Sequence, residues 1–234
     1  MSSIASAMVC YVVFLFSTTL HEASHALAAK LGGDPTAYHG GQVSLDPRPH
    51  IRREPFGMVI LPLLTSLVSG WPLGFASAPY NPEWALRYPR RAAWMALAGP
   101  GANLALVVAA ALLLRLGGLV GVFYAPQAVG FDHLAAAQGG GLWTTAGFVL
   151  SVFFSLNLVL VCLNLIPLPP LDGSAAVPLL LGERSGAQYQ QFLLGSGRAF
   201  SFLGMLAAWK LFDIVFQPIF LLAVNLLYPG SHYG

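Results

Sequence analysis

The segment His21-Glu22-Ala23-Ser24-His25 lies inside an almost uncharged apolar run that extends from Ile4 to Leu31. About 20 apolar residues are enough for a helix to cross the hydrocarbon core of a bilayer, so this run is long enough to span one. Two histidines and a glutamate are costly at membrane depth unless they bind something or face water. Their position inside a membrane span therefore predicts a functional site in the bilayer.

The composition predicts an all-α polytopic membrane protein. Hydrophobic residues make up 56% of the chain and charged residues 9%, whereas ordinary soluble domains have roughly 25% charged residues. We expect one transmembrane domain over residues 1–234, surrounded by the lipid bilayer. The formal net charge is +2, and the basic residues are scattered through the predicted loops without forming a stripe. We therefore expect no nucleic-acid partner.

Four apolar segments are long enough to cross the bilayer, at about 4–31, 92–116, 143–166 and 199–228. A fifth apolar segment, 57–78, is interrupted by Pro62, Gly70, Pro72 and Gly74, which predicts a re-entrant hairpin instead of a straight span. Turn residues beside a short alternating stretch predict a small β element at 38–47, near the membrane surface.

His21 and His25 have the spacing of two metal ligands on one helix. Positions i and i+4 lie about 40° apart around the axis and about 6 Å apart along it, so both imidazoles can reach one ion. Glu22 projects near the same face without being forced into the coordination sphere, which suits a general base acting on water. Two imidazoles do not complete a catalytic zinc site, because such sites typically have three protein ligands.

The candidates for a third ligand at membrane depth are Asp172 and Asp213. Asp172 follows a proline-rich segment, 167–170, that ends the preceding helix and places the carboxylate on irregular backbone, which is tolerated beside a cavity. Asp213 lies three residues after Lys210, which fits a helix-surface ion pair or a contact within the bundle. We prefer Asp172.

The charge pattern tests how often the chain crosses the bilayer. His25 and Asp172 can meet only if an even number of crossings separates them, and 92–116 and 143–166 already supply two. The segment 57–78 should therefore enter and leave by one face. Most basic residues then fall on one side, which the positive-inside rule makes cytosolic: Lys30, Arg48, Arg52, Arg53, Arg87, Arg90, Arg91, Arg184 and Arg198.

Three motifs occur together in this chain: His21-Glu22-Ala23-Ser24-His25, then Ala98-Gly99-Pro100-Gly101-Ala102-Asn103, then Asn164 to Gly173 with its Pro-x-Pro and Leu-Asp-Gly. Their order and combination resemble the site-2 protease family of intramembrane zinc metalloproteases. The likeness runs from the first span through Gly173. It includes Gly74 to Pro82, which is similar to the short bacterial members without a PDZ or CBS domain.

The resemblance implies one zinc ion bound by His21, His25 and Asp172 in a core of three transmembrane helices, with Glu22 as the catalytic base. It implies hydrolysis of peptide bonds within or near the membrane-spanning segment of a single-span membrane protein or peptide. The expected location is the bacterial inner membrane, with the active site toward the cytosolic side. Ser77 stands where short relatives often carry Lys, so the choice of substrate stays open.

The asparagines have alternative roles. Asn164 and Asn103 lie beside helix breaks, where an amide can bond free backbone groups, or where it can bind an extended substrate or the developing oxyanion. The family favours the second role for Asn164, and we expect substrate binding by both. Asn157 fits a hydrogen bond between helices.

The alternative function is a non-proteolytic metal-binding membrane protein, or a regulatory pseudoprotease that binds transmembrane helices without cutting them. The presence of Glu22 argues against a pseudoprotease, because binding alone needs no base.

Overall fold

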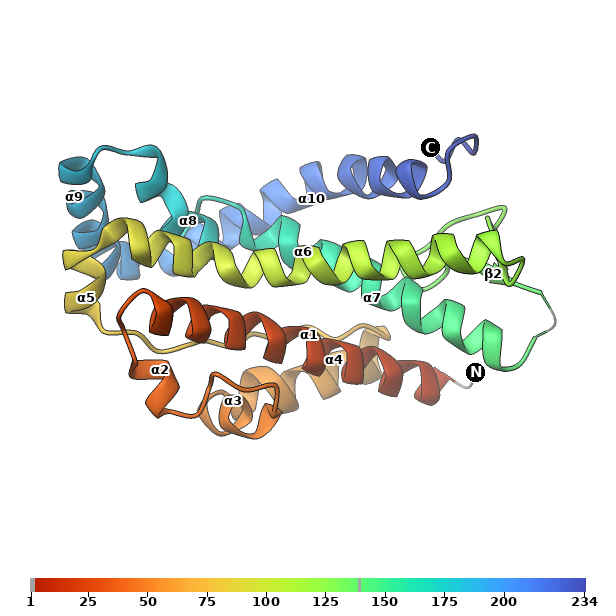
Figure 1. The fold of residues 1–234 in the computed structure, drawn as a ribbon, viewed down its shortest axis with the longest axis horizontal. Helices are drawn as coiled ribbons and strands as arrows, with labels where there is room; N and C mark the ends of the chain where they lie inside the picture. Colours follow the sequence, from red (N-terminus) through yellow and green to blue (C-terminus); the bar gives the residue numbers. More distant parts are fainter. Residues whose placement is uncertain (1–2, 139) are drawn as a thin grey trace.

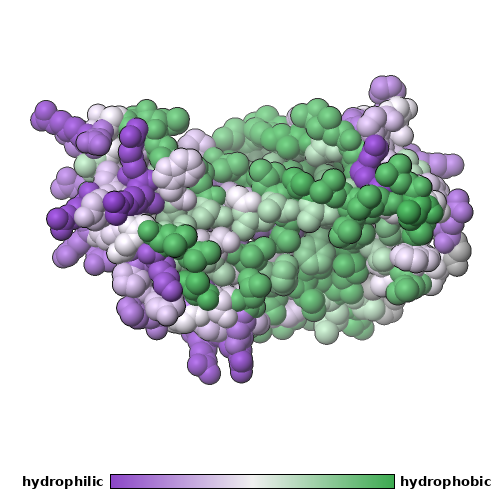
Figure 2. Space-filling view, viewed as in Figure 1, coloured by the Kyte–Doolittle hydropathy of each residue, from purple (hydrophilic) through white to green (hydrophobic). Residues whose placement is uncertain are grey.

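The computed structural model describes residues 3–138 and 140–234. Four long helices run along the molecule (Figure 1): α1 (Ser3–Leu31), α6 (Pro89–Leu119), α7 (Leu142–Asn164) and α10 (Ser201–Leu227). Each is long and apolar enough to cross a membrane, which confirms the four predicted spans. Figure 2 shows the result as a broad apolar surface between two ends that carry most of the hydrophilic side chains.

Three of these helices, α1, α6 and α7, contact one another and form the centre of the bundle. Cys10 and Val13 of α1 pack on Val152 of α7, and a larger apolar cluster joins α6 and α7 to α10. The helix α10 lies at the edge of the bundle. Only 22% of its most apolar 18-residue stretch is buried, whereas 50% of the corresponding stretch of α7 is buried. Its remaining apolar side chains are available to contact lipid.

The segment 57–78 folds as a hairpin. A π-helix (Phe56–Ile60) leads into α4 (Leu61–Ser69), which lies beside α1 and ends at Gly70 in the left-handed conformation, with φ of 76°. The chain then returns without helix or strand over residues 71–81, which we call the return segment. Phe75 N in this segment donates to Gly57 O at 3.1 Å. Figure 1 shows this return segment running back to the end of the bundle from which α4 departed.

Two glycines allow the return segment to lie close to the π-helix. A Cβ added to Gly57 would lie 2.2 Å from the carbonyl oxygen of Phe75, and one added to Gly74 would lie 2.3 Å from the carbonyl oxygen of Gly57. Neither distance is possible between a real Cβ and an oxygen. The hairpin therefore depends on the absence of side chains at both positions.

The prediction of a β element at 38–47 is wrong. The structure has α2 (Thr36–His39), a turn, and α3 (Pro47–Arg53) there. Asp46 caps α3 by accepting from Arg48 N, with proline at the first helical position. The turn residues that indicated a strand boundary are thus helix-capping residues. The small two-stranded sheet lies instead between α6 and α7, where β1 (Phe123–Tyr124) pairs antiparallel with β2 (Ala136–Ala137).

Short helices cover the opposite end of the bundle from this sheet. The helix α5 (Pro82–Arg87) follows the return segment and contacts α9 (Glu183–Leu194). Between α7 and α9 lie α8 (Asp172–Ala176) and a 3-10 helix (Val177–Leu180), and a second 3-10 helix (Ser196–Phe200) leads into α10. These elements bring the segment after α7 back against α6 (Figure 1).

Candidate metal centre

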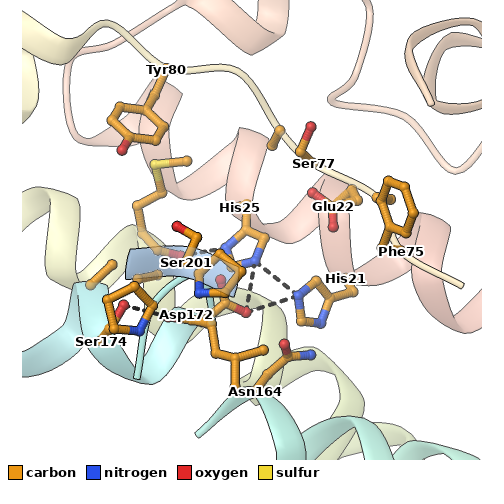
Figure 3. Close-up of a pocket in the computed structure, with 18 of the residues that line it drawn as sticks. His21, Glu22, His25, Phe75, Ser77, Tyr80, Asn164, Asp172, Ser174 and Ser201 are labelled. Atoms are coloured by element: carbon orange, nitrogen blue, oxygen red, sulfur yellow. Dashed lines mark hydrogen bonds and ion pairs between the residues drawn. The ribbon is translucent and has the colours of Figure 1, made fainter. Parts of the chain in front are cut away.

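The two histidines of α1 point to one place. His21, Glu22 and His25 are all buried, and their potential ligand atoms lie within 4.8 Å of one another. Nε2 of His21 and Nε2 of His25 are 2.9 Å apart. The i, i+4 spacing on a continuous helix therefore produces the predicted pair (Figure 3).

Asp172 comes to the same point from a different part of the chain. Its Oδ2 lies 3.1 Å from Nε2 of His21 and 3.4 Å from Nε2 of His25. The proline-rich turn after α7 makes this possible, and Gly173 lets it pack tightly, because an added Cβ would lie 2.4 Å from the carbonyl oxygen of Leu165. Asp213, the other candidate, is exposed on α10 and lies outside this group.

Nδ1 of His25 lies 2.7 Å from the backbone carbonyl oxygen of Met95. A carbonyl only accepts, so Nδ1 carries the proton and a neutral His25 directs its Nε2 lone pair toward Asp172.

The three atoms fit one small cation. In a tetrahedral site with zinc bonds of about 2.0–2.1 Å, ligand atoms are about 3.3 Å apart, and the observed separations are 2.9, 3.1 and 3.4 Å. Gly99 of α6 faces the same space. A Cβ added there would lie 2.3 Å from Nε2 of His25 and 2.5 Å from Nε2 of His21, close to the distance of a bound metal. The donor set, two imidazoles and a carboxylate, is one that zinc accepts.

Asn103 and Asn164, the two predicted substrate contacts, differ in their surroundings. Asn164 is half-buried and lines the cavity beside the histidines (Figure 3). Asn103 is fully buried, is not among the cavity-lining residues, and uses its amide for bonds to His21 and Asn157. The polar atoms of Asn103 thus have protein partners, whereas Asn164 faces the cavity. The predicted inter-helix hydrogen bond of Asn157 is confirmed.

A cavity of about 550 Å³ opens beside the three metal-binding candidates. Figure 3 shows Phe75, Ser77 and Tyr80 of the return segment on one side of the histidines, and Asp172 and Asn164 on the other. Other parts of the wall come from α6, α9, the 3-10 helix after α9, and the start of α10. The site is thus enclosed by segments that follow α1 at very different distances along the chain.

Three residues that line this cavity each have a buried polar atom with no hydrogen-bond partner among the described residues: Thr18 Oγ1, Glu22 Oε2 and Gln190 Oε1. Buried polar groups are normally paired, so open ones beside a cavity indicate groups that bind something from outside. The sequence motifs include neither Thr18 nor Gln190. Thr18 lies three residues before His21, which makes it a helical neighbour of that ligand candidate, whereas nothing in the sequence around Gln190 indicates the site.

A known protein family matches most of the chain, including the residues of this site. The family model described as Peptidase family M50 matches residues 9–204. The chain belongs to peptidase family M50. This is the metallopeptidase family of the site-2 proteases, which the three motifs indicated, and it makes the protein an integral membrane protein.

Relatives in the M50 family are similar over long stretches. "Putative zinc metalloprotease YwhC" of Bacillus subtilis is 31% identical over 226 residues, which cover 89% of this chain and 92% of that protein. "Putative zinc metalloprotease Rip2" of Mycobacterium tuberculosis H37Rv is 37% identical over 184 residues, which cover 77% of this chain and 61% of that protein. The match thus leaves a large part of Rip2 uncovered. No solved structure matches the chain.

Proposed function

We propose that His21, His25 and Asp172 hold the zinc ion of this M50 peptidase and that Glu22 is its catalytic base. The protein is an intramembrane zinc metalloprotease, since both the family and the names of its relatives describe such enzymes. One observation carries the assignment of residues: three ligand atoms converge within 3.4 Å of one another, beside a cavity that Glu22 also lines.

Zinc bound there would supply Lewis-acid chemistry, by lowering the pKa of water toward ~7 and polarising the carbonyl of the scissile peptide. Glu22 supplies the proton transfers. Its Oε2 takes a proton from the attacking water and later delivers it to the leaving amine. Glu22 is buried, so bulk water does not compete for that proton.

The substrate has to be extended where it is cut, because a helix keeps its carbonyl groups in internal hydrogen bonds. The return segment offers a partner for such an extended chain. Ala76 and Ala78 line the cavity, and among the described residues their backbone groups have no hydrogen-bond partner. We propose that the substrate pairs with this segment as an added strand. Asn164 and Gln190 would then bind its backbone from the other side of the cavity.

The orientation in the membrane is part of the proposal. The helix α1 ends, and α5 lies, at the end of the bundle that carries α9 (Figure 1). Basic residues lie in the last turn of α1, in α3, in α5 and in the first turn of α6. His21 and His25 are in the second half of α1 (Ser3–Leu31), nearer to that end. By the positive-inside rule this end is cytosolic. We propose a bacterial inner membrane as the location and single-span membrane proteins as the substrates.

The test is cleavage of single-span peptides by the reconstituted protein, compared with Glu22→Gln and Asp172→Asn. We expect cleavage by the native protein only. Zinc should remain in Glu22→Gln and be lost from Asp172→Asn, because only the second removes a ligand. Cleavage that persists in both variants would contradict the assignment of residues. Zinc binding without cleavage in any sample would favour a metal-binding protein that does not cut.

A further inference from the structure

A continuous path of hydrogen bonds leads away from the proposed metal site through the interior of the bundle. Nδ1 of His21 lies 2.5 Å from Oδ1 of Asn103, and Nδ2 of Asn103 donates to Oδ1 of Asn157 at 2.8 Å. Nδ2 of Asn157 then donates to the backbone carbonyl of Phe153 at 2.8 Å. All three side chains are buried, and together they connect α1, α6 and α7.

The backbone determines which way each amide in this path points. The Phe153 carbonyl can only accept, so Asn157 must turn its NH₂ group toward it and its oxygen toward Asn103. The carbonyl of Ser17 lies 3.4 Å from Nδ2 of Asn103 and imposes the same direction on that amide. Turning either amide over would bring two oxygens together and leave buried groups unpaired, at a cost of about 1–3 kcal/mol for each group.

The direction of the path decides which nitrogen of a neutral His21 ring carries the hydrogen. Asn103 presents only an oxygen to the imidazole, so Nδ1 must carry the proton and a neutral ring keeps its lone pair on Nε2. Nε2 is the atom that lies 3.1 Å from Asp172 and 2.9 Å from His25. A histidine binds a metal through such a lone pair, and a partner on the other nitrogen holds the ring in place.

We propose that Asn103 and Asn157 are positioning residues. Anchored by the backbone carbonyl of Phe153, they set the tautomer and the ring orientation with which His21 binds zinc. This inference rests on the zinc site proposed above. It also separates Asn103 from substrate binding. A residue that acts through His21 changes zinc affinity, whereas a residue that touches substrate changes peptide binding.

The experiment measures zinc affinity of the full-length protein in detergent, by competition with a chromophoric chelator, for Asn103→Leu, Asn103→Asp and Asn157→Leu. Losing an outer partner of a metal-bound histidine typically costs about 10–100-fold in metal affinity, and we expect that loss for Asn103→Leu. Asn103→Asp should recover most of it in its protonated form, because that carboxyl accepts from Nδ1–H through one oxygen and donates to Oδ1 of Asn157 through the other. The loss in Asn157→Leu should be smaller, since the Ser17 carbonyl still holds Asn103.

Ser155→Ala is the matched control. Ser155 is buried on α7 two residues before Asn157, and its Oγ has no partner among the described residues. We expect native zinc affinity in this variant. Thermal unfolding of each zinc-free variant shows whether a change reflects loss of the fold, and the recovery in Asn103→Asp keeps the test valid if Asn103→Leu unfolds.

Peptide binding provides the second readout. In a Glu22→Gln background that cannot cut, the affinity for a single-span peptide should be unchanged by Asn103→Asp. Cobalt spectra of zinc-replaced samples should change in Asn103→Leu and keep the native form in Ser155→Ala.

Native zinc affinity in a folded Asn103→Leu protein that still cleaves peptides would overturn this inference alone. Zinc affinity that depends on Asn103 in a protein that cleaves nothing would support the inference and contradict the protease assignment.

Discussion

The polar groups behind His21 and those facing the cavity differ in one respect. Behind His21, each amide hydrogen of Asn103 and Asn157 has an acceptor, and the path ends on backbone carbonyls. On the cavity side, the buried oxygens of Thr18, Glu22 and Gln190 have no partner among the described residues. Paired groups hold a neighbouring side chain in one position, whereas unpaired groups remain available for a reactant. This contrast separates positioning from binding within one site.

The largest effect should come from the unpaired carboxylate. In Glu22→Gln we expect the rate of peptide cleavage to fall by about 10²–10⁴-fold, the usual contribution of a general base, because the amide cannot take a proton from water. Zinc content should stay native, as measured by metal analysis of the purified protein. Loss of zinc together with activity would place Glu22 among the ligands instead.

A smaller effect should follow from filling the space beside both histidines. Gly99→Ala puts a Cβ 2.3 Å from Nε2 of His25, and such overpacking typically costs about 1–3 kcal/mol. We therefore expect zinc affinity to fall by roughly 10–100-fold, measured by chelator competition.

Gly101→Ala is the control on the same helix, because nothing lies within 4 Å of an added Cβ there. Alanine favours a helix over glycine by about 1 kcal/mol, so Gly101→Ala should keep its zinc and unfold at the native temperature or above. Equal zinc affinity in the two variants would mean that the space beside Gly99 does not hold the ion.

Gln190 tests whether unpaired groups bind substrate. Gln190→Leu removes an amide that can donate to and accept from a peptide backbone, and one hydrogen bond contributes about 0.5–1.5 kcal/mol. We expect KM for a single-span peptide to rise by roughly 2–10-fold with kcat and zinc content unchanged. Gln191→Leu, an exposed neighbour on α9, should leave KM as it is. A change in zinc affinity would instead indicate that Gln190 positions a metal ligand.

The smallest effect compares two adjacent threonines. Thr18 and Thr19 are both buried with unpaired hydroxyls, but only Thr18 is among the residues that line the cavity. Thr18→Val should raise KM by roughly 2–5-fold through loss of one hydrogen bond, while Thr19→Val should not change it. Steady-state cleavage of one peptide by both variants measures the difference. Equal effects would show that lack of a partner does not by itself identify a binding group.

The long-range features followed from simple patterns, and the errors were local. Apolar runs located four spans, and the requirement that His25 and Asp172 meet identified the hairpin at 57–78. The strand expected at 38–47 was wrong, because proline and aspartate begin a helix as readily as they mark a turn, and Asp46 caps α3. The sequence does not distinguish the two roles considered for Asn103, because a helix break can expose an amide to substrate or bury it against a neighbouring helix.

The HExxH spacing and the apolar runs were enough to specify a metal site inside a membrane bundle, because both depend only on helix period and length. The packed bundle was needed to show which polar groups are paired. Ser17 and Asn157, which are hydrogen-bonded to each other, are 140 residues apart in the sequence. Gln190 follows all the recognisable motifs. Whether such a group positions a metal ligand or binds a substrate depends on which helices contact each other. The spacing of residues in the sequence does not determine that contact.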